Sequence, residues 1–357
     1  MAVVATGFFD GVHLGHRQVI QALVSCARRK GEEAIAVTFS QHPRAVLQQD
    51  ARTLRLLNSP QEKEALLRSL GVDRVVSLPF DRAFARLSAE QYIRTVLQER
   101  LGATVLVLGY DNRLGSDRLT PDLIRPVAKG LGLEVVVVPP ASAGMQLQQS
   151  PLETSGCAGP LPPPSAAGPS KGWQPGPPKI SRFLGWSSRG WLRSPGATAA
   201  TAGIPAEPAD TPVSSTKIRE ALEKGKVEAA EAMLGYAYRL RGVVVGGKQL
   251  GRTIGFPTAN LRLYDPMKLI PARGVYLTEV EVTGRHFWGM TNVAEPIETH
   301  IFDFDEDIYG LDLEIRFRRF LRPMRAFGSL DALKAQLTAD EATCRALLET
   351  ASEKGEF

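Results

Sequence analysis

The sequence has few cysteines and no long hydrophobic run. Its three cysteines, Cys26, Cys157 and Cys344, are far apart and odd in number, so neither a disulfide framework nor a metal-binding spacing is visible. This usage is typical of a reducing compartment, and we expect a cytoplasmic protein. Apolar runs such as residues 135–138 are too short to cross a bilayer. Met1 leads directly into a predicted strand without the features of a signal peptide, so no membrane partner is expected.

The sequence also lacks any strong excess of one charge. It has 43 Lys and Arg against 38 Asp and Glu, a net charge of +5, and no long basic run. A mild excess of this kind does not favour binding to nucleic acid. The 357 residues are 43% hydrophobic and 23% charged, which is sufficient for two or three folded domains. Nothing in the composition indicates an oligomeric state.

The most informative stretch is residues 7–16, Gly-Phe-Phe-Asp-Gly-Val-His-Leu-Gly-His. It follows a short apolar run and precedes a helical pattern that ends near Gly31. A glycine-rich loop before a helix N-terminus favours phosphate binding, because free N–H groups point at the ligand. His13 and His16 lie three residues apart, so one helical turn would place both at one site, where they can stabilise charge on a phosphate. The turn alone is a weak signal, however, and the spacing equally allows two surface histidines.

Apolar strand patterns alternate with helical patterns through the first half. This alternation predicts a parallel sheet that is covered by helices on both faces. Ligands bind at the carboxyl ends of such strands, where residues 7–16 and 109–113 both lie. The predicted elements after the first helix are at 34–39, 59–71, 74–78, 88–102, 104–108, 121–129 and 133–138.

The composition changes at residues 141–212, where Pro, Gly, Ser and Ala dominate. Such a segment cannot bury enough apolar surface to offset the entropy lost on ordering, which predicts a disordered insertion. Its tryptophans, Trp173, Trp186 and Trp191, are unusual for a disordered tract. We interpret them as incidental, with a docking element as the alternative.

A cluster of hydroxyl residues follows, in Val-Ser-Ser-Thr-Lys-Ile-Arg at 213–219. Ser and Thr at a helix start are by default N-caps. Hydroxyls, free N–H groups and the Arg219 cation at one helix start also suit a phosphate. A helical pattern continues at 220–234 and ends at Gly235.

Strand patterns dominate the second half, at 241–245, 274–282 and 297–304. Leu311, Leu313, Ile315 and Phe317 alternate with charged residues, which predicts a half-buried strand of a barrel or sandwich. A final helix is predicted at 329–348.

Several motifs resemble those of one known family. Residues 7–16 resemble the nucleotide-binding signature of the adenylyltransferase half of bacterial bifunctional riboflavin kinase/FAD synthetases. The His-x-Gly-His core is shared with other nucleotidylyl transferases and with class I aminoacyl-tRNA synthetases. Residues 213–219 resemble the family's second signature and not the lysine-rich loop of the synthetases. Gly-Phe-Pro-Thr-Ala-Asn at 255–260 closely resembles the riboflavin kinase signature. The stretches 38–44, 108–115, 289–293, 298–304 and 307–310 are also similar to family motifs.

The resemblance implies a fold class and a domain organisation. An α/β nucleotidylyltransferase domain with a Rossmann-like parallel sheet would occupy residues 1–234, with the insertion at 141–212 inside it. A riboflavin kinase domain would occupy residues 235–357. Its expected fold is a small antiparallel six-stranded β-barrel with a C-terminal helix.

Carried onto this sequence, the resemblance also implies site residues. The catalytic residues would be His13, His16 and Glu298, the last as general base toward the ribityl 5′-hydroxyl. ATP contacts would fall on Gly7, Phe8, Asp10, Gly15, Ser215, Thr216, Arg219, Gly251 and Gly255. Flavin contacts would fall on Asp111, Arg322 and Arg325, and Mg²⁺ ligands on Thr258 and Asn260. Judged without the family, Asp111, Thr258 and Asn260 are turn formers, and Glu298 is better explained as an exposed polar position on a strand. A solvated basic face explains Arg322 and Arg325 equally well.

The implied function is ATP-dependent phosphorylation of riboflavin to FMN, followed by adenylylation of FMN to FAD, with Mg²⁺ in both reactions. Two departures qualify it. Asn112 and Leu114 stand where relatives usually carry aromatics, and the join from Val293 to Ile297 lacks a glycine-containing loop. The alternative is therefore an FAD synthetase whose kinase half is impaired, because a strand shifted by one residue would turn Glu298 to the opposite face. A binding protein that has lost both activities is a third hypothesis.

Overall fold

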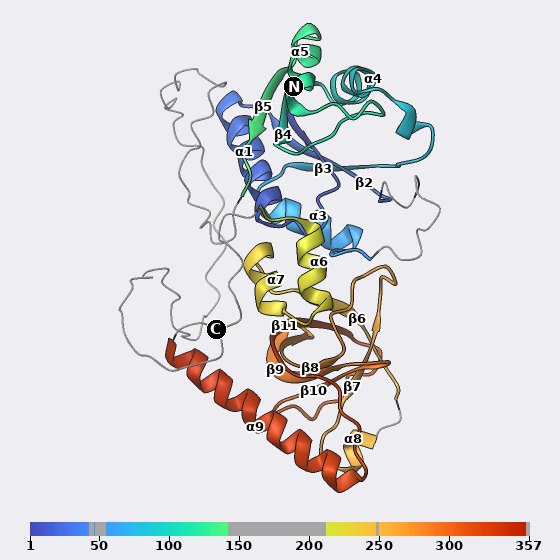
Figure 1. The fold of residues 1–357 in the computed structure, drawn as a ribbon, viewed down its shortest axis with the longest axis vertical. Helices are drawn as coiled ribbons and strands as arrows, with labels where there is room; N and C mark the ends of the chain where they lie inside the picture. The colour runs from blue at the N-terminus through green and yellow to red at the C-terminus, as the bar shows by residue number, and fades with distance from the viewer. Residues whose placement is uncertain (43–45, 47–54, 142–211, 248–249, 355–357) are drawn as a thin grey trace, which may run out of the picture. The chain divides into compact units, whose positions relative to one another are not determined.

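The computed structural model describes residues 1–42, 46, 55–141, 212–247 and 250–354. Within them, a five-stranded parallel sheet with helices is followed along the chain by a closed six-stranded barrel (Figure 1). The predicted fold class is therefore confirmed.

The first half forms a parallel sheet in the order β3-β2-β1-β4-β5. The central strands are almost completely buried, because helices cover both faces. The order of strands reverses between β1 and β4, which is the point where open α/β sheets bind ligands. The strands are β1 (Ala2–Thr6), β2 (Glu33–Phe39), β3 (Arg74–Leu78), β4 (Ala103–Gly109) and β5 (Glu134–Val138).

The helices of this half begin and end where the capping residues predict. Ser59 and Glu62 form a capping box at the start of α3, and Ser88 with Gln91 forms another at α4. α1 is followed by Gly31 in the left-handed conformation. One face of the sheet carries α1 (Leu14–Lys30) and α3 (Pro60–Ser69). The other carries α4 (Ala89–Gln91), its π-helical continuation η3 (Tyr92–Arg100) and α5 (Pro121–Gly130).

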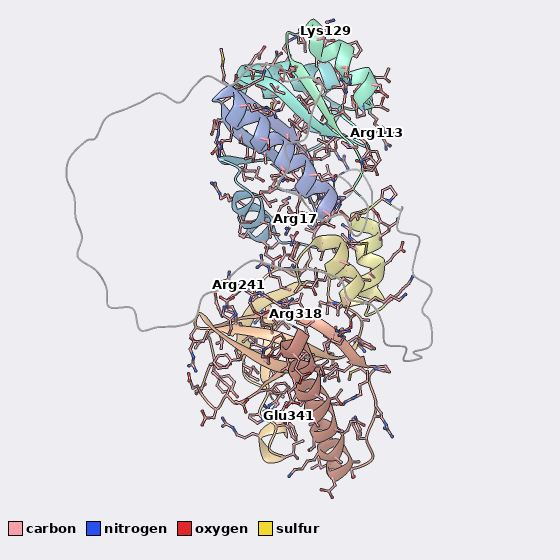
Figure 2. The ribbon with its side chains drawn as sticks, turned by 90° about the vertical axis from the view of Figure 1, so that its left-hand side faces the viewer. Arg17, Arg113, Lys129, Arg241, Arg318 and Glu341 are labelled. Carbon is pink, nitrogen blue, oxygen red and sulfur yellow. The ribbon has the colours of Figure 1, made fainter. Side chains whose placement is uncertain are left out.

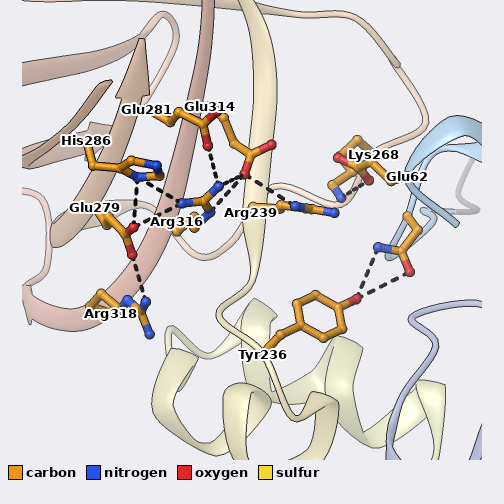
Figure 3. Close-up of polar contacts among 11 residues, drawn as sticks. Glu62, Tyr236, Arg239, Lys268, Glu279, Glu281, His286, Glu314, Arg316 and Arg318 are labelled. Carbon is orange, nitrogen blue, oxygen red and sulfur yellow. Dashed lines mark hydrogen bonds and ion pairs between the residues drawn. The ribbon is translucent and has the colours of Figure 1, made fainter. Parts of the chain in front are cut away.

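The second half is an antiparallel barrel in the order β10-β7-β6-β11-β8-β9. Leu313, Ile315 and Phe317 are fully buried inside it, as their alternation predicts, whereas Leu311 precedes the strand and is exposed. On the outer face Arg316 pairs with three glutamates, two on β8 and one on its own strand β11 (Figure 3). The strands are β6 (Arg239–Val245), β7 (Ala259–Leu263), β8 (Gly274–Val282), β9 (Arg285–Val293), β10 (Ile297–Ile301) and β11 (Asp312–Arg322).

The single helix predicted at 220–234 is wrong, because the segment forms two helices, α6 (Ser215–Glu223) and α7 (Val227–Leu234). Gly225 lies between them with a φ of 73°, a conformation that favours glycine. Buried side chains of both helices, including Ile218 and Leu234, share one hydrophobic cluster with the barrel core. The proposed division at residue 234 thus crosses a common core, and that boundary stays a prediction.

The last helix, α9 (Leu330–Lys354), is longer than the predicted 329–348. Its Cys344 packs against Leu277 and Met290 of the barrel. The short helix α8 (Leu250–Thr253) was not predicted. Figure 2 shows the side chains over the same fold, with Glu341 on α9 and Lys129 on the last turn of α5. No helix among the described residues is long and apolar enough to span a membrane.

The Pro- and Gly-rich segment lies outside the described residues except at its two ends. There the N–H of Val213 donates to the carbonyl of Ala141 at 3.2 Å. The chain therefore leaves the fold and re-enters it at one place, as expected for an insertion in a loop. The predictions of disorder and of incidental tryptophans fall outside the described residues, as does Cys157.

Candidate active sites

The first site lies where the strand order reverses, at the carboxyl ends of β1 and β4. The loops after these two strands and the start of α6 line a cavity of about 380 Å³. The structure thus brings together residues that are more than 200 positions apart, such as Asp10 and Arg219. Those predicted to bind here that line the cavity are Gly7, Phe8, Asp10, His13, Gly15, His16, Asp111, Ser215, Thr216 and Arg219.

The two histidines form a stacked pair at the start of α1, with ring centroids 3.7 Å apart. His13 is the N-cap, and its Nδ1 accepts the N–H of His16 at 3.4 Å. A neutral His13 therefore carries its proton on Nε2. Gly15 makes room for this ring, because a Cβ there would lie 3.3 Å from it. The spacing prediction, that one helical turn brings both side chains to one site, is confirmed.

Burial keeps both imidazoles neutral. It lowers the pKa of His13 to about 4, with Arg219 adding to the effect. The pKa of His16 lies well below its ordinary value, through burial and through the nearby His13 and Lys63. Nδ1 of His16 is buried and has no hydrogen-bond partner among the described residues. A buried polar atom of this kind is costly unless a ligand pairs with it.

The loop between β1 and α1 contains two residues in the left-handed region, Phe9 with φ 54° and Val12 with φ 38°. This backbone is strained for a β-branched residue such as Val12. It is held by the N–H of Val12, which donates to the Phe9 carbonyl at 3.1 Å, and by Arg17, which donates to the Val12 carbonyl at 3.3 Å. The loop is therefore fixed in shape before any ligand arrives.

Asp10 and Arg219 form an ion pair that joins the two signature motifs. The carboxylate of Asp10 also accepts the N–H groups of Leu57 and Asn58 at 3.0 and 3.3 Å. Burial raises the pKa of Asp10, while Arg219 and these N–H donors oppose the rise. Asp10 thus orients the arginine at the edge of the cavity.

The hydroxyl residues at the start of α6 have two roles: one caps the helix, and the others lie at the cavity. Ser214 is the N-cap, and its hydroxyl accepts the N–H of Lys217. Ser215 donates to the Asp10 carbonyl at 2.9 Å, and Thr216 is exposed at the cavity.

Asn112 and Leu114, which stand where relatives usually carry aromatics, do not disturb the packing of the loop after β4. Asn112 donates to the Thr6 carbonyl at 3.1 Å, and Leu114 is buried.

Lys63 of α3 supports the first loop of the site, a role that the sequence did not reveal. It is almost completely buried beneath the first loop. Its Nζ donates to the carbonyls of Phe8 and Phe39 at 3.1 and 3.3 Å and lies 4.1 Å from the centre of the Phe8 ring. Burial lowers its pKa to about 8. No motif marks this lysine, because its role depends on contacts across 55 and 24 positions.

The second site is built on the barrel from two adjoining cavities that share Thr258. One, of about 300 Å³, is lined by the loop residues 304–309. The other, of about 580 Å³, is more apolar and is lined by Phe327 and Leu337 together with Asn260 and Glu298. Thr258 therefore lies on the wall that the two cavities have in common.

Three adjacent strands place Asn260, Glu298 and Asn292 side by side. Glu298 of β10 is directly opposite Asn260 of β7 and Asn292 of β9, so all three point to one face. This corrects the expectation of a shifted strand: the short join leaves Glu298 facing the cavity. The amide oxygen of Asn260 is buried without a partner among the described residues. An unpaired amide oxygen beside the Thr258 hydroxyl fits the hard ligands that Mg²⁺ prefers.

The remaining predicted residues of this site differ in their surroundings. Gly251 belongs to α8 and Gly255 to the turn that follows it. Only a glycine fits at 251, where a Cβ would lie 2.1 Å from the Phe256 carbonyl. Arg322 lines the apolar cavity but forms a bidentate ion pair with Asp340 of α9. Arg325 is exposed at its rim. No group of three or more His, Cys, Asp or Glu side chains within the described ranges is arranged to hold a metal.

Comparison with known proteins matches both halves. The family model for FAD synthetase matches residues 1–151, and that for riboflavin kinase matches residues 234–348. A bifunctional riboflavin kinase/FMN adenylyltransferase from Listeria monocytogenes is 30% identical over 354 residues, covering 96% of this chain and 91% of the relative. The chain belongs to this family. The Escherichia coli K12 member is 29% identical over 353 residues, again covering 96% and 91%.

The Bacillus subtilis member of the family is 28% identical over 354 residues and covers 95% of this chain and 90% of its own. Among solved structures, a Streptococcus pneumoniae protein described as a macrolide-efflux protein superposes with a TM-score of 0.72 at 28% identity. That match covers 96% of this chain and 94% of the other. The family assignment therefore extends over both halves of the chain.

Proposed function

We propose that this bifunctional enzyme phosphorylates riboflavin on the barrel and adenylylates the resulting FMN at the parallel sheet. The observation that carries the proposal is the presence of two separate, chemically complete sites, each in the part of the chain matched by the corresponding family model. ATP is the second substrate of both reactions.

In the kinase reaction, Glu298 accepts the proton of the ribityl 5′-hydroxyl. The oxygen attacks the γ-phosphorus of ATP, the bond to the β-phosphate oxygen breaks, and FMN and ADP form. The apolar cavity is lined by the predicted ATP contact Gly251 and by the predicted flavin contacts Arg322 and Arg325, so phosphoryl transfer takes place in it, beside Thr258. Thr258 and Asn260 would hold Mg²⁺, which neutralises phosphate charge when bound.

In the adenylyl transfer, a phosphate oxygen of FMN attacks the α-phosphorus of ATP. The bond to the bridging oxygen breaks, and FAD and pyrophosphate form without net proton transfer. Neutral His13 and His16 donate hydrogen bonds to the phosphate oxygens as charge shifts between them, and Arg219 with the α6 N-terminus binds the leaving pyrophosphate. Asp111, exposed at the cavity rim, contacts the flavin.

The impaired-kinase alternative is not favoured, because Glu298 lies opposite Asn260 in the cavity. Kinase turnover should therefore be normal without the missing loop. The direct test incubates the protein with ATP and Mg²⁺ plus either riboflavin or FMN and separates the flavins by chromatography. FMN and FAD should form from riboflavin, and FAD from FMN. If FMN or FAD does not form, the protein lacks the corresponding activity. Location in the cytoplasm remains a prediction from the cysteine usage.

A further inference from the structure

Asn292 of β9 holds a buried acceptor that the reaction described above does not use. Its amide oxygen is inaccessible to solvent and has no hydrogen-bond partner within the described parts of the chain. The residue lines the apolar cavity of the barrel. A buried acceptor without a donor costs free energy, so its retention at a cavity wall indicates a donor on the ligand.

The position of Asn292 identifies which ligand group that donor belongs to. Asn260 and Asn292 flank Glu298 on opposite sides, since β10 lies between β7 and β9. The proposed metal ligands Thr258, which precedes β7, and Asn260 lie on the β7 side of Glu298, whereas Asn292 lies on the β9 side. Asn292 is thus on the side of Glu298 away from the phosphates. The nearest donor on a flavin whose 5′-hydroxyl meets Glu298 is the neighbouring hydroxyl of the ribityl chain.

We propose that Asn292 is a specificity-determining residue of the kinase: its amide oxygen accepts a hydrogen bond from the ribityl 4′-hydroxyl. The inference rests on the proposed kinase function. A site built to pair with a substrate hydroxyl discriminates strongly against an analogue that lacks it, because the buried group is then left unpaired. With Asn292 in place, 4′-deoxyriboflavin is a poor substrate. Without Asn292, riboflavin and 4′-deoxyriboflavin have nearly equal kcat/KM.

The test compares kcat/KM for riboflavin and 4′-deoxyriboflavin in the full-length wild type and in Asn292→Ala, with 2′-deoxyriboflavin as the matched substrate control. The wild type should prefer riboflavin over the 4′-deoxy analogue by about tenfold or more, and Asn292→Ala should prefer it by less than about twofold. His286→Ala, on the exposed part of β9, serves as the control variant and should keep the wild-type preference.

Each outcome is decisive. If Asn292→Ala keeps the full preference for the 4′-hydroxyl, or if the wild type has none, the inference is wrong. A preference lost equally for the 2′-hydroxyl would also overturn it, since that indicates general loosening of the cavity. Phosphorylation of 4′-deoxyriboflavin by Asn292→Ala at or above the wild-type rate shows that the barrel is folded, and FMN adenylylation at the wild-type rate shows the same of the other half. A wild type that phosphorylates no flavin at all would instead refute the kinase function itself.

Discussion

Arg219 donates a hydrogen bond to the carboxylate of Asp10, a residue 209 positions earlier in the chain. This ion pair joins the glycine-rich loop after β1 to the N-terminal turn of α6. The carboxylate is nearly inaccessible, with 5% of its side chain exposed, and the arginine is exposed to 19%. The arginine is therefore pre-oriented at the cavity, with its remaining donors available for an anionic ligand.

We expect Arg219→Met to reduce the kcat/KM of FAD formation from FMN by at least about a hundredfold, because a charge-assisted donor to the phosphates is lost and Asp10 is left buried without its partner. FMN formation from riboflavin should not change. The control is Arg28→Met, which removes an arginine from an exposed pair with Asp73 in the same half. Equal adenylylation rates in Arg219→Met and wild type would disprove the role assigned to this arginine.

Acid should destabilise the fold through the histidine pair. The pKa of His13 is lowered from 6.5 to about 4 by burial, so the unfolded chain binds more protons between these values. The contribution of neutral His13 to the free energy of unfolding is fully present above pH 6.5. It falls by up to about 3 kcal/mol as the pH drops to 4. His13→Asn keeps an N-cap acceptor but removes the titration. Urea unfolding across pH 4–7 should show a shallower slope for this variant, and an unchanged slope would contradict the account.

Lys268 forms a buried ion pair with Glu62 at 2.5 Å, with 3% and 12% of the two side chains exposed (Figure 3). It also donates to the Leu57 carbonyl at 2.8 Å. Lys268→Met leaves Glu62 buried without its cation and should lower the free energy of unfolding by about 3 kcal/mol or more. Adding Glu62→Gln should recover part of that loss.

The matched control for Lys268 is Arg241→Met, because both side chains of the Arg241–Asp312 pair are exposed. It should cost less than about 1 kcal/mol. Equal losses in urea unfolding for the Lys268 and Arg241 variants would show that burial of the Lys268 pair has no energetic consequence.

Local signals predicted the elements that depend on local chemistry. The capping boxes at Ser59 and Ser88 and the alternation from Leu313 to Phe317 each specify an element within a few residues, and the structure agrees. The break at Gly225 was missed, since a glycine between two apolar helical patterns resembles a tolerated interior glycine. The family resemblance, rather than spacing, supplied the barrel and the grouping of Thr258, Asn260 and Glu298.

Contacts distant in sequence were not predictable from local patterns. Lys63 reaches the carbonyls of Phe8 and Phe39, and Asn292 lies opposite Glu298 only because of the strand register. The short join after Val293 suggested a misplaced Glu298, but chain length there does not decide the register. The pairing of β10 with both β7 and β9 decides it.

The central claim is that one chain carries two independent active sites, and two variants test it together. His16→Ala and Glu298→Gln are each incubated with riboflavin, ATP and Mg²⁺, and the flavins are quantified by chromatography. His16→Ala should accumulate FMN, with FAD formation about a hundred- to thousandfold slower. Glu298→Gln should leave riboflavin unchanged yet convert added FMN to FAD at the wild-type rate. A mixture of the two should produce FAD from riboflavin. Loss of both activities in either folded variant, or no FAD from the mixture, would contradict the account.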